Sequence, residues 1–219
     1  MTAALTVTPT PDPVLVKVVL DESGSMASMA ADLIGGFNTY LAELRASRKD
    51  FRVSLVKFDS VDPFNVVYRD VPVGTVPDLT PDTYRPRGGT PLWDAVGRTI
   101  LETRAEPGQG VLVVIYTDGE ENESREFTAE RVRQLVLERE ALGWTFVYLG
   151  ASESAWQNEN AFRGTRLAAN VYRSTGGTGT RSAHEHLSAA TIGYAGMGHS
   201  ISALLVTDED RAEVLRASD

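Results

Sequence analysis

The sequence contains no cysteine and only three histidines in 219 residues. The absence of cysteine excludes disulfides, thiol nucleophiles and thiolate metal sites, although it is compatible with any redox compartment. No apolar run approaches the roughly 20 residues that a membrane-spanning helix needs. We therefore expect no contact with a membrane.

Basic residues are also in short supply. The chain has 21 Lys and Arg against 30 Asp and Glu, which gives a net charge of −9. Because nucleic-acid binding depends on clustered Lys and Arg, we expect no nucleic-acid partner. The Thr- and Pro-rich residues 1–13 lack the basic and apolar regions of a signal peptide. We expect them to form a flexible arm, and we expect the protein to be cytoplasmic.

Strand-like and helix-like segments alternate from residue 14 to about residue 205. This pattern predicts a single α/β domain with a mostly parallel sheet and helices on both faces. A short gap at residues 59–63 predicts an antiparallel hairpin at one sheet edge. The expected strands are residues 14–20, 51–58, 64–73, 111–117, 144–149 and 170–172.

The hydrophobic spacing also predicts the helices and the longer loops. Residues 74–90, rich in Pro, Gly, Thr and Asp, are expected to form a long surface loop, and residues 174–180 a flexible glycine-rich loop. Residues 206–219 are expected to be a tail, with a short helix from about residue 208. The expected helices are residues 28–46, 91–101, 127–142, 150–154 and 181–197.

Five side chains that carry oxygen atoms lie in three short stretches of the chain. Residues 14–20 and 111–117 are hydrophobic runs, and each leads directly into an aspartate. Because neighbouring parallel strands end at the same edge, where open α/β sheets bind ligands, we expect these aspartates to lie close together. Hydroxyl groups are neutral oxygen ligands that suit a hard cation. The candidate metal ligands are Asp21, Ser23, Ser25, Thr90 and Asp118.

The type of ligand indicates the type of metal. Carboxylate and hydroxyl oxygens, without His or Cys, favour Mg²⁺, with Mn²⁺ or Ca²⁺ as alternatives, over Zn²⁺ or Cu²⁺. The helix expected after Ser25 turns its positive end toward the site, which disfavours a cation. Asp21 and Asp118 must offset that effect. Either aspartate alone would more simply be read as a helix N-cap.

These residues resemble the von Willebrand factor type A (VWA) domain and its metal-ion-dependent adhesion site (MIDAS). The pattern is Asp-x-Ser-x-Ser at residues 21–25, a distant Thr90, and Thr117-Asp118-Gly119 after a later strand. The resemblance implies a Rossmann-like sheet with one antiparallel edge strand. It also implies that an acidic side chain of a partner protein completes the coordination of the metal. The chain would then be a binding module and not an enzyme.

The residues after Asp118 are similar to those of bacterial and phage intracellular members of the family. Such proteins often occur with AAA+ ATPases, so an AAA+ system is one expected partner, and a monomer is the expected state. In relatives, binding at the metal is coupled to displacement of the last helix. If residues 181–197 form that helix, residues 174–180 could serve as its hinge.

The alternative function is a metal-dependent hydrolase or phosphotransferase that uses the same pocket. Aspartyl-phosphate phosphatases carry an Asp-x-Asp pattern in which the second aspartate is the general acid. In this chain the second position of that pattern is Ser23. Ser25 does not lie in the Gly-x-Ser-x-Gly pattern of serine hydrolases. Neither enzyme class fits the residues as well as a binding module does.

Several other polar residues are expected to have ordinary roles. His184 and His186 are two residues apart on an expected helix, so they should point in different directions and lie at the surface. Glu120 and Glu121 are expected to be solvated loop charges, with a secondary contact to the cation as the alternative. Arg85 and Arg87 are expected to be exposed, with selection of an acidic partner as the alternative. The tryptophans at 93, 144 and 156 are expected to pack in the core or at its rim.

Overall fold

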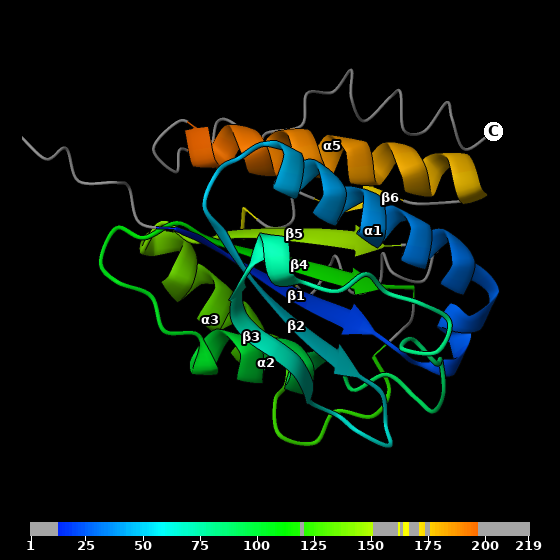
Figure 1. Cartoon of the computed structure of the whole chain (residues 1–219). Helices are drawn as coiled ribbons and strands as arrows, with labels where there is room; N and C mark the ends of the chain where they lie inside the picture. The colour runs from blue at the N-terminus through cyan, green and yellow to red at the C-terminus, as the bar shows by residue number, and fades with distance from the viewer. Residues whose placement is uncertain are drawn as a thin grey trace, which may run out of the picture.

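The computed structural model describes residues 13–118, 121–150, 162, 164–166, 171–173 and 176–196. Its sheet has six strands in the order β3-β2-β1-β4-β5-β6 (Figure 1). Only β3 is antiparallel to its neighbour, so the expected mostly parallel sheet with one antiparallel edge strand is confirmed. The strands are β1 (Val14–Asp21), β2 (Phe51–Phe58), β3 (Asn65–Pro72), β4 (Val111–Thr117), β5 (Thr145–Gly150) and β6 (Val171–Arg173).

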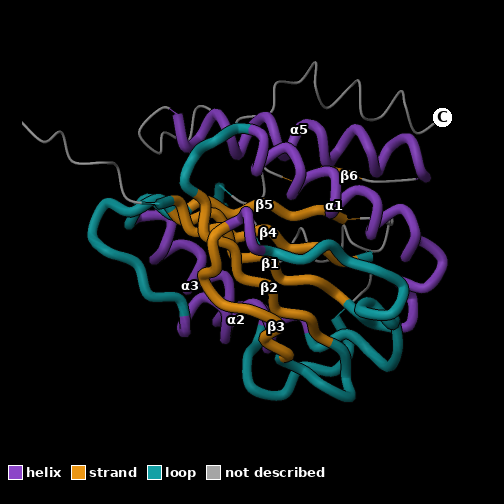
Figure 2. The backbone as a smooth tube through the Cα atoms, in the orientation of Figure 1, coloured by secondary structure: helices purple, strands orange, loops and turns teal. Residues whose placement is uncertain are grey.

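Helices cover both faces of this sheet (Figures 1 and 2). On one face lie α1 (Ala30–Ala46) and α5 (Gly176–Gly196), and on the other α2 (Leu92–Glu102) and α3 (Ala129–Ala141). Two short 3₁₀ helices, η1 (Gly24–Met29) and η2 (Val73–Thr75), complete the described elements. The result is a three-layer α/β arrangement.

The side chains of β1 alternate between the two helical layers. Val16, Val18 and Leu20 belong to the core beneath α1 and α5, whereas Leu15 and Val19 belong to the core beneath α2 and α3. A strand covered on both faces needs apolar residues at nearly every position. This requirement explains the almost unbroken hydrophobic run before Asp21.

Lys17 is the exception in that run. Its side chain is 3% exposed, forms an ion pair with Asp70 of β3, and donates a hydrogen bond to Ser54 of β2 over 3.2 Å. Burial lowers the pKa of Lys17, and its contact with Asp70 opposes that shift. Asp70 has a positive φ of 49° where the pairing of β2 with β3 is irregular. The ion pair therefore accompanies a bulge in the edge strand.

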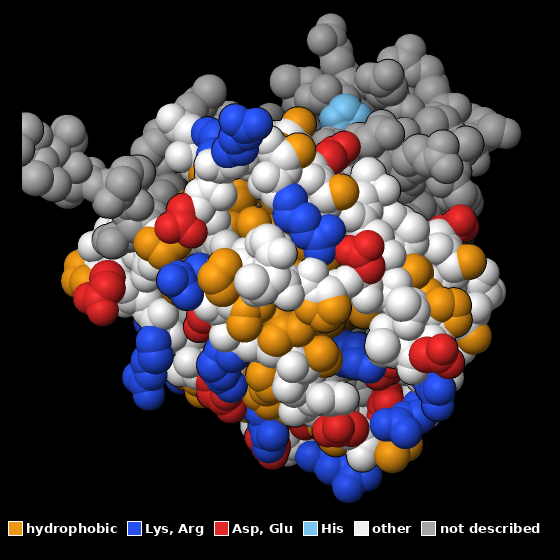
Figure 3. Space-filling model, in the orientation of Figure 1, with side chains coloured by type: hydrophobic (Ala, Val, Ile, Leu, Met, Phe, Trp, Pro, Cys, Tyr) orange, Lys and Arg blue, Asp and Glu red, His pale blue; other side chains and the backbone are white. Residues whose placement is uncertain are grey.

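The outer surface near β3 mixes hydrophobic and charged groups. In the view of Figure 1, hydrophobic side chains gather near the centre of the face, over β3 and η2, and charged side chains of both signs surround them (Figure 3). Val67 of β3 is 45% exposed. The adjacent loop is only partly a surface loop, because Val76, Leu79 and Tyr84 are buried in the core beneath α1.

Two expectations for the last helix are wrong. Residues 174–180 were expected to form a flexible loop, but α5 already begins at Gly176. Helix propensity is a weak guide that tertiary context overrides. His184, expected at the surface, is 3% exposed, and its ring stacks on Tyr116 with centroids 5.4 Å apart. The expected helix from residue 181 onward is confirmed.

Some expectations fall on residues outside the described ranges. These include the N-terminal arm, the short helix at 150–154, Trp156 and the tail from residue 206. The domain limits of 14 and 205 therefore stay predictions. None of the described helices is long and apolar enough to span a bilayer.

Candidate metal centre

The candidate metal centre lies where β1 and β4 end. These strands are parallel neighbours, with Leu20 opposite Tyr116, so both deliver their last residues to the same edge. Thr117 donates a hydrogen bond from its hydroxyl to Oδ2 of Asp21 over 2.6 Å. Asp118 follows immediately. The expectation that Asp21 and Asp118 share one edge of the sheet is confirmed.

Hydrogen bonds join four of the five candidate ligands into a chain. The backbone N–H of Ser23 donates to Oδ1 of Asp21 over 2.7 Å. The hydroxyls of Ser23 and Ser25 lie 3.1 Å apart, and the Ser25 hydroxyl donates to Oδ1 of Asp118 over 2.8 Å. The turn after β1 is thus connected to the end of β4 through Ser25, although 93 positions separate Ser25 from Asp118.

The turn after β1 brings the two serines to the same side. Ser23 has extended backbone angles (φ −67°, ψ 162°) and stands at the N-cap of η1. Met26 closes the turn by donating its N–H to the carbonyl of Ser23 over 3.1 Å. Because the chain wraps tightly here, alternate serines can both face the end of β4.

Thr90 reaches this edge through its backbone. It is 2% exposed, and Asn122 binds it twice: Thr90 N–H donates to Oδ1 of Asn122 over 2.8 Å, and Asn122 N–H donates to the Thr90 carbonyl over 3.2 Å. Gly24 donates its N–H to the carbonyl of Gly88 over 3.0 Å, so the Thr90 loop touches the turn after β1. Within the described ranges, no hydrogen bond joins the Thr90 hydroxyl to the other four side chains.

Burial raises the pKa of both aspartates at this site. Asp21 is 0% exposed, and burial raises its pKa to about 6, with the charge of Asp118 adding to the increase. Hydrogen bonds from Thr117 and Ser23 act in the opposite direction. Burial likewise raises the pKa of Asp118, against the effect of its hydrogen bond from Ser25. A divalent cation would relieve this crowding of negative charge.

The donor set fits a hard cation that retains water. The described residues hold no group of three or more His, Cys, Asp or Glu side chains suited to a metal. The candidate ligands are instead two carboxylates and three hydroxyls. Mg²⁺ commonly binds through one or two carboxylates and keeps several waters, so this set suits it.

Asp94, which the sequence did not single out, organises the loop after β4. Its side chain lies in the first turn of α2 and the residue is 6% exposed. The carboxylate accepts hydrogen bonds of 2.8–2.9 Å from three consecutive backbone N–H groups, those of Arg125, Glu126 and Phe127. A single acidic residue at a helix start carries no sequence signal for such a role.

Glu121 has a similar role, so its expected place as a solvated loop charge is wrong. Its carboxylate accepts hydrogen bonds from the backbone N–H groups of Trp93 (3.0 Å), Glu123 (3.0 Å) and Ser124 (2.6 Å). These bonds tie the loop after β4 to the start of α2. The expectation for Trp93 and Trp144 is confirmed, since they are 7% and 5% exposed.

No protein-family model and no curated protein matches this sequence. Solved structures do match its fold. The pilus adhesin SpaC from Lactobacillus rhamnosus GG, in its open conformation, is 13% identical, with a TM-score of 0.66 over 84% of this chain and 30% of that chain. A von Willebrand factor type A protein from Catenulispora acidiphila is 16% identical, with a TM-score of 0.58 over 83% and 43%.

A third similar structure is proximal thread matrix protein 1 from the mussel byssus, with a zinc-occupied MIDAS motif. It is 13% identical, with a TM-score of 0.60 over 82% of this chain and 48% of that chain. The chain thus spans less than half the length of these three proteins. Together they show that it has the fold of a VWA domain.

Proposed function

We propose that this chain is a metal-dependent protein-binding module. In this proposal a divalent cation at Asp21, Ser23, Ser25, Thr90 and Asp118 recruits an acidic side chain of a partner protein. The observation that carries the proposal is the hydrogen-bonded chain that brings Asp21, Ser23, Ser25 and Asp118 together at one edge of the sheet.

Each residue has a distinct task in this proposal. Ser23 and Ser25 offer neutral oxygens, and Asp21 and Asp118 balance the charge of the cation. Thr117 and the backbone of Ser23 hold the Asp21 carboxylate in a fixed orientation. When bound, Mg²⁺ supplies an electrophilic centre at which an outside carboxylate can replace a water molecule.

The site geometry gives no support to the alternative, a hydrolase or phosphotransferase. The position of the phosphatase general acid is Ser23, whose hydroxyl lies within hydrogen-bond distance of Ser25. A serine hydroxyl does not ionise near neutral pH and is a poor general acid. Of the three similar structures named above, one is a pilus adhesin, which also favours a binding role.

The proposed partner is a protein with an accessible Asp or Glu. An AAA+ ATPase system and a cytoplasmic setting stay predictions from the sequence. The names of the similar structures include pilus and byssus proteins, so likeness in fold does not favour the cytoplasm.

Calorimetric titration with Mg²⁺, repeated with Mn²⁺ by electron paramagnetic resonance, tests the metal site directly. We expect wild type to bind one ion, and Asp118→Ala to weaken binding by at least about 100-fold, beyond the usual loss from removing an indirect partner of a metal ligand. Glu102→Ala is the control, because Glu102 is exposed at the last residue of α2 and pairs with the exposed Arg69 of β3. Equal binding by wild type and Asp118→Ala would refute the proposal.

Partner recruitment is tested by retention on immobilised protein in the presence of Mg²⁺ or EDTA. Proteins that depend on the site should be retained by wild type with Mg²⁺. They should be lost with EDTA and lost from Asp118→Ala even when Mg²⁺ is present. Retention that is unaffected by EDTA and by Asp118→Ala would contradict a metal-mediated contact.

A further inference from the structure

Glu22 stands between two candidate ligands, and its side chain points away from them. The side chain is 7% exposed and lies 2.9 Å from Nζ of Lys57, which is 12% exposed. The same carboxylate oxygen accepts the backbone N–H of Arg85 over 2.6 Å. A buried carboxylate is costly unless it is paired and hydrogen-bonded. Glu22 is paired with Lys57 of β2 and hydrogen-bonded to Arg85 of the loop that leads to Thr90.

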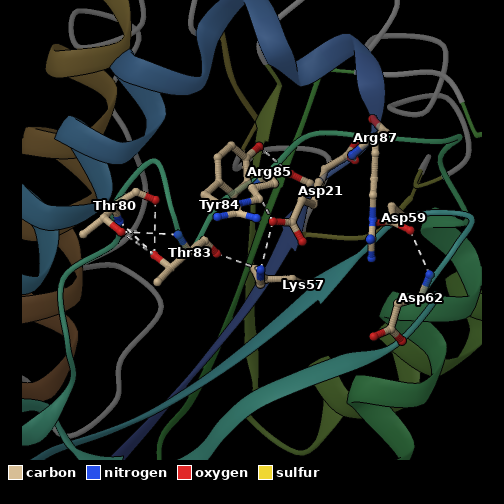
Figure 4. Close-up of polar contacts among 11 residues, drawn as sticks. Asp21, Lys57, Asp59, Asp62, Thr80, Thr83, Tyr84, Arg85 and Arg87 are labelled. Atoms are coloured by element: carbon tan, nitrogen blue, oxygen red, sulfur yellow. Dashed lines mark hydrogen bonds and ion pairs between the residues drawn. The ribbon is translucent and has the colours of Figure 1, made fainter.

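Lys57 extends this contact further along the loop. It is the next-to-last residue of β2, and besides Glu22 it donates a hydrogen bond to the carbonyl of Thr83 over 2.8 Å. Figure 4 shows Lys57 with Thr83 on one side and the loop residues Tyr84 and Arg85 above it. One ammonium group therefore bridges the turn after β1 and the loop.

Two backbone groups next to the metal centre bind the same loop. The hydroxyl of Tyr84, which is 2% exposed, donates to the carbonyl of Asp21 over 2.6 Å. Arg87 donates its N–H to the carbonyl of Glu22 over 2.7 Å. Arg87 also donates from Nε to Oδ2 of Asp59 over 2.7 Å, and Figure 4 draws both residues.

These bonds fix a stretch that has no helix or strand of its own. Between η2 and α2, residues 76–91 form neither helix nor strand, yet the loop is bound at Thr83, Tyr84, Arg85 and Arg87. Thr90 follows three residues after Arg87. A loop without regular structure holds a side chain in place only if its backbone is bound in this way.

We propose that Glu22 and Lys57 form a clamp that positions Thr90 for the metal while touching no metal themselves. The inference rests on the proposed function, since it assigns these residues to that metal site. Partners that orient metal ligands typically change metal affinity by about 10–100-fold when they are mutated. Glu22 and Lys57 are positioning residues of this kind.

Two single variants separate the clamp from a simple charge effect. If Glu22 acted only through its negative charge, Glu22→Gln would weaken Mg²⁺ binding and Lys57→Met would strengthen it. If the two residues act as a clamp, both variants weaken binding, by about 10-fold each. Opposite signs, or two affinities equal to that of wild type, would overturn the proposal.

Tyr84→Phe provides a second route if Lys57→Met fails to fold. It removes one hydrogen bond to the Asp21 carbonyl without changing any charge, and we expect it to weaken Mg²⁺ binding by several-fold, in line with about 1 kcal/mol for a single hydrogen bond. An unchanged affinity in Tyr84→Phe together with Glu22→Gln would also overturn the clamp.

Lys17→Met is the matched control for Lys57→Met. Both lysines lie in sheet strands, are at most 12% exposed and pair with a carboxylate, but Lys17 pairs with Asp70 and not with the turn after β1. We expect Lys17→Met to lower stability and to leave Mg²⁺ affinity unchanged. If it weakens Mg²⁺ binding as much as Lys57→Met does, the effect is general loosening of the sheet and the clamp is refuted.

Amide hydrogen exchange in metal-free protein tests the clamp without relying on the proposed function. The N–H groups of Arg85 and Arg87 should be protected in wild type and should exchange at least about 10-fold faster in Glu22→Gln, following the loss of a charge-assisted bond. Unchanged protection would overturn the clamp. Absent Mg²⁺ binding by wild type, with protection lost in the variant, would instead refute the proposed function and leave the clamp as a loop-fixing device.

Discussion

The two ends of the sheet are built differently. At the end where β1 and β4 stop, carboxylates bind the backbone around the long loop after β4: Asp94, which is 6% exposed, and the partly buried Glu121 each accept three backbone N–H groups. At the opposite end the connections from α1 to β2 (residues 47–50) and from α3 to β5 (residues 142–144) are short. Gly108 and Gly143 turn the chain there with positive φ angles of 84° and 90°, and a Cβ on either would meet nothing within 4 Å.

The difference shows what a binding site requires of a loop. A short turn is fixed by its own backbone angles, but a long loop must satisfy many buried N–H groups by other means. Carboxylates with several lone pairs do this efficiently. The end with the candidate metal centre is therefore held by polar contacts, whereas the opposite end is held by turn geometry.

The largest expected effect comes from removing Asp94. Asp94→Ala leaves three backbone N–H groups without their acceptor, and we expect the free energy of unfolding to fall by about 4 kcal/mol. Urea denaturation measures the change. Asp94→Asn, which retains an acceptor oxygen, should cost less.

Gln109→Ala provides the comparison at the opposite end. Gln109 donates to the Pro13 carbonyl over 2.9 Å and accepts the N–H of Glu106 over 3.1 Å. We expect a loss of about 1 kcal/mol for these two bonds. If Gln109→Ala costs as much as Asp94→Ala, the two ends do not differ as described.

The pH dependence of stability should report the crowding of Asp21 and Asp118. Burial raises the pKa of Asp21 from 3.8 to about 6, so between these values the folded chain binds more protons than the unfolded chain. The contribution of Asp21 to the free energy of unfolding therefore falls as pH rises, by at most about 3 kcal/mol in total, and the fall is complete by about pH 6. Asp21→Asn should gain stability relative to wild type over the same interval.

Metal should reverse that loss at neutral pH. With Mg²⁺ at 100 times its Kd, the folded state should gain about 2.7 kcal/mol, and Asp21→Asn should gain little. Thermal denaturation at pH 4, 5, 6 and 7, with and without Mg²⁺, measures both effects. If the stability difference between wild type and Asp21→Asn stays constant from pH 4 to pH 7, the pH dependence does not come from a raised pKa of Asp21.

Two neighbouring glycines in α1 allow a test of how closely α1 packs against α5, between the two ends of the sheet. A Cβ on Gly36 would lie 2.4 Å from the ring of His184, whereas a Cβ on Gly35 would meet nothing within 4 Å. Because the ring is buried against Tyr116, Gly36→Ala should destabilise by about 2 kcal/mol. Gly35→Ala should stabilise by about 0.5–1 kcal/mol. Equal effects in chemical denaturation would refute the close packing of α1 against α5.

The smallest effect is expected for Arg85→Ala. The Arg85 side chain is 72% exposed and pairs with Asp82, which is 92% exposed, so its loss should change stability by less than about 0.5 kcal/mol. The backbone N–H that binds Glu22 remains. Mg²⁺ affinity should also stay within about two-fold of wild type, since exposed pairs contribute little, and a larger loss in titration would show that the side chain itself assists the site.

The sequence predicts the central strands well because β1 and β4, covered on both faces, are buried at every position. Strand β2 and the antiparallel β3 lie where hydrophobic alternation and the short gap after residue 58 place them. The last helix was predicted less well. Its buried positions include His184, Ser188 and Thr191, which do not form the apolar stripe that marks a buried helix face.

Of the candidate site, only the motif residues were predicted from the sequence. Asp21 and Asp118 follow from strand ends, but Glu22 and Asn122 act through backbone groups of residues far away in the sequence. Such contacts depend on the fold of a long loop, which leaves no periodic pattern. One signal was present in Lys57, a charged residue near the end of a largely buried strand.

The irregular edge strand has a consequence for solubility. β3 offers an open edge, and a flat open edge invites pairing with a strand of another molecule. The bulge at Asp70, the inward ion pair with Lys17, the exposed Arg69 and the terminal Pro72 all interrupt that edge. Such interruptions are usual safeguards against edge-to-edge pairing, so the β3 edge is poorly suited to pairing with a strand of a second copy.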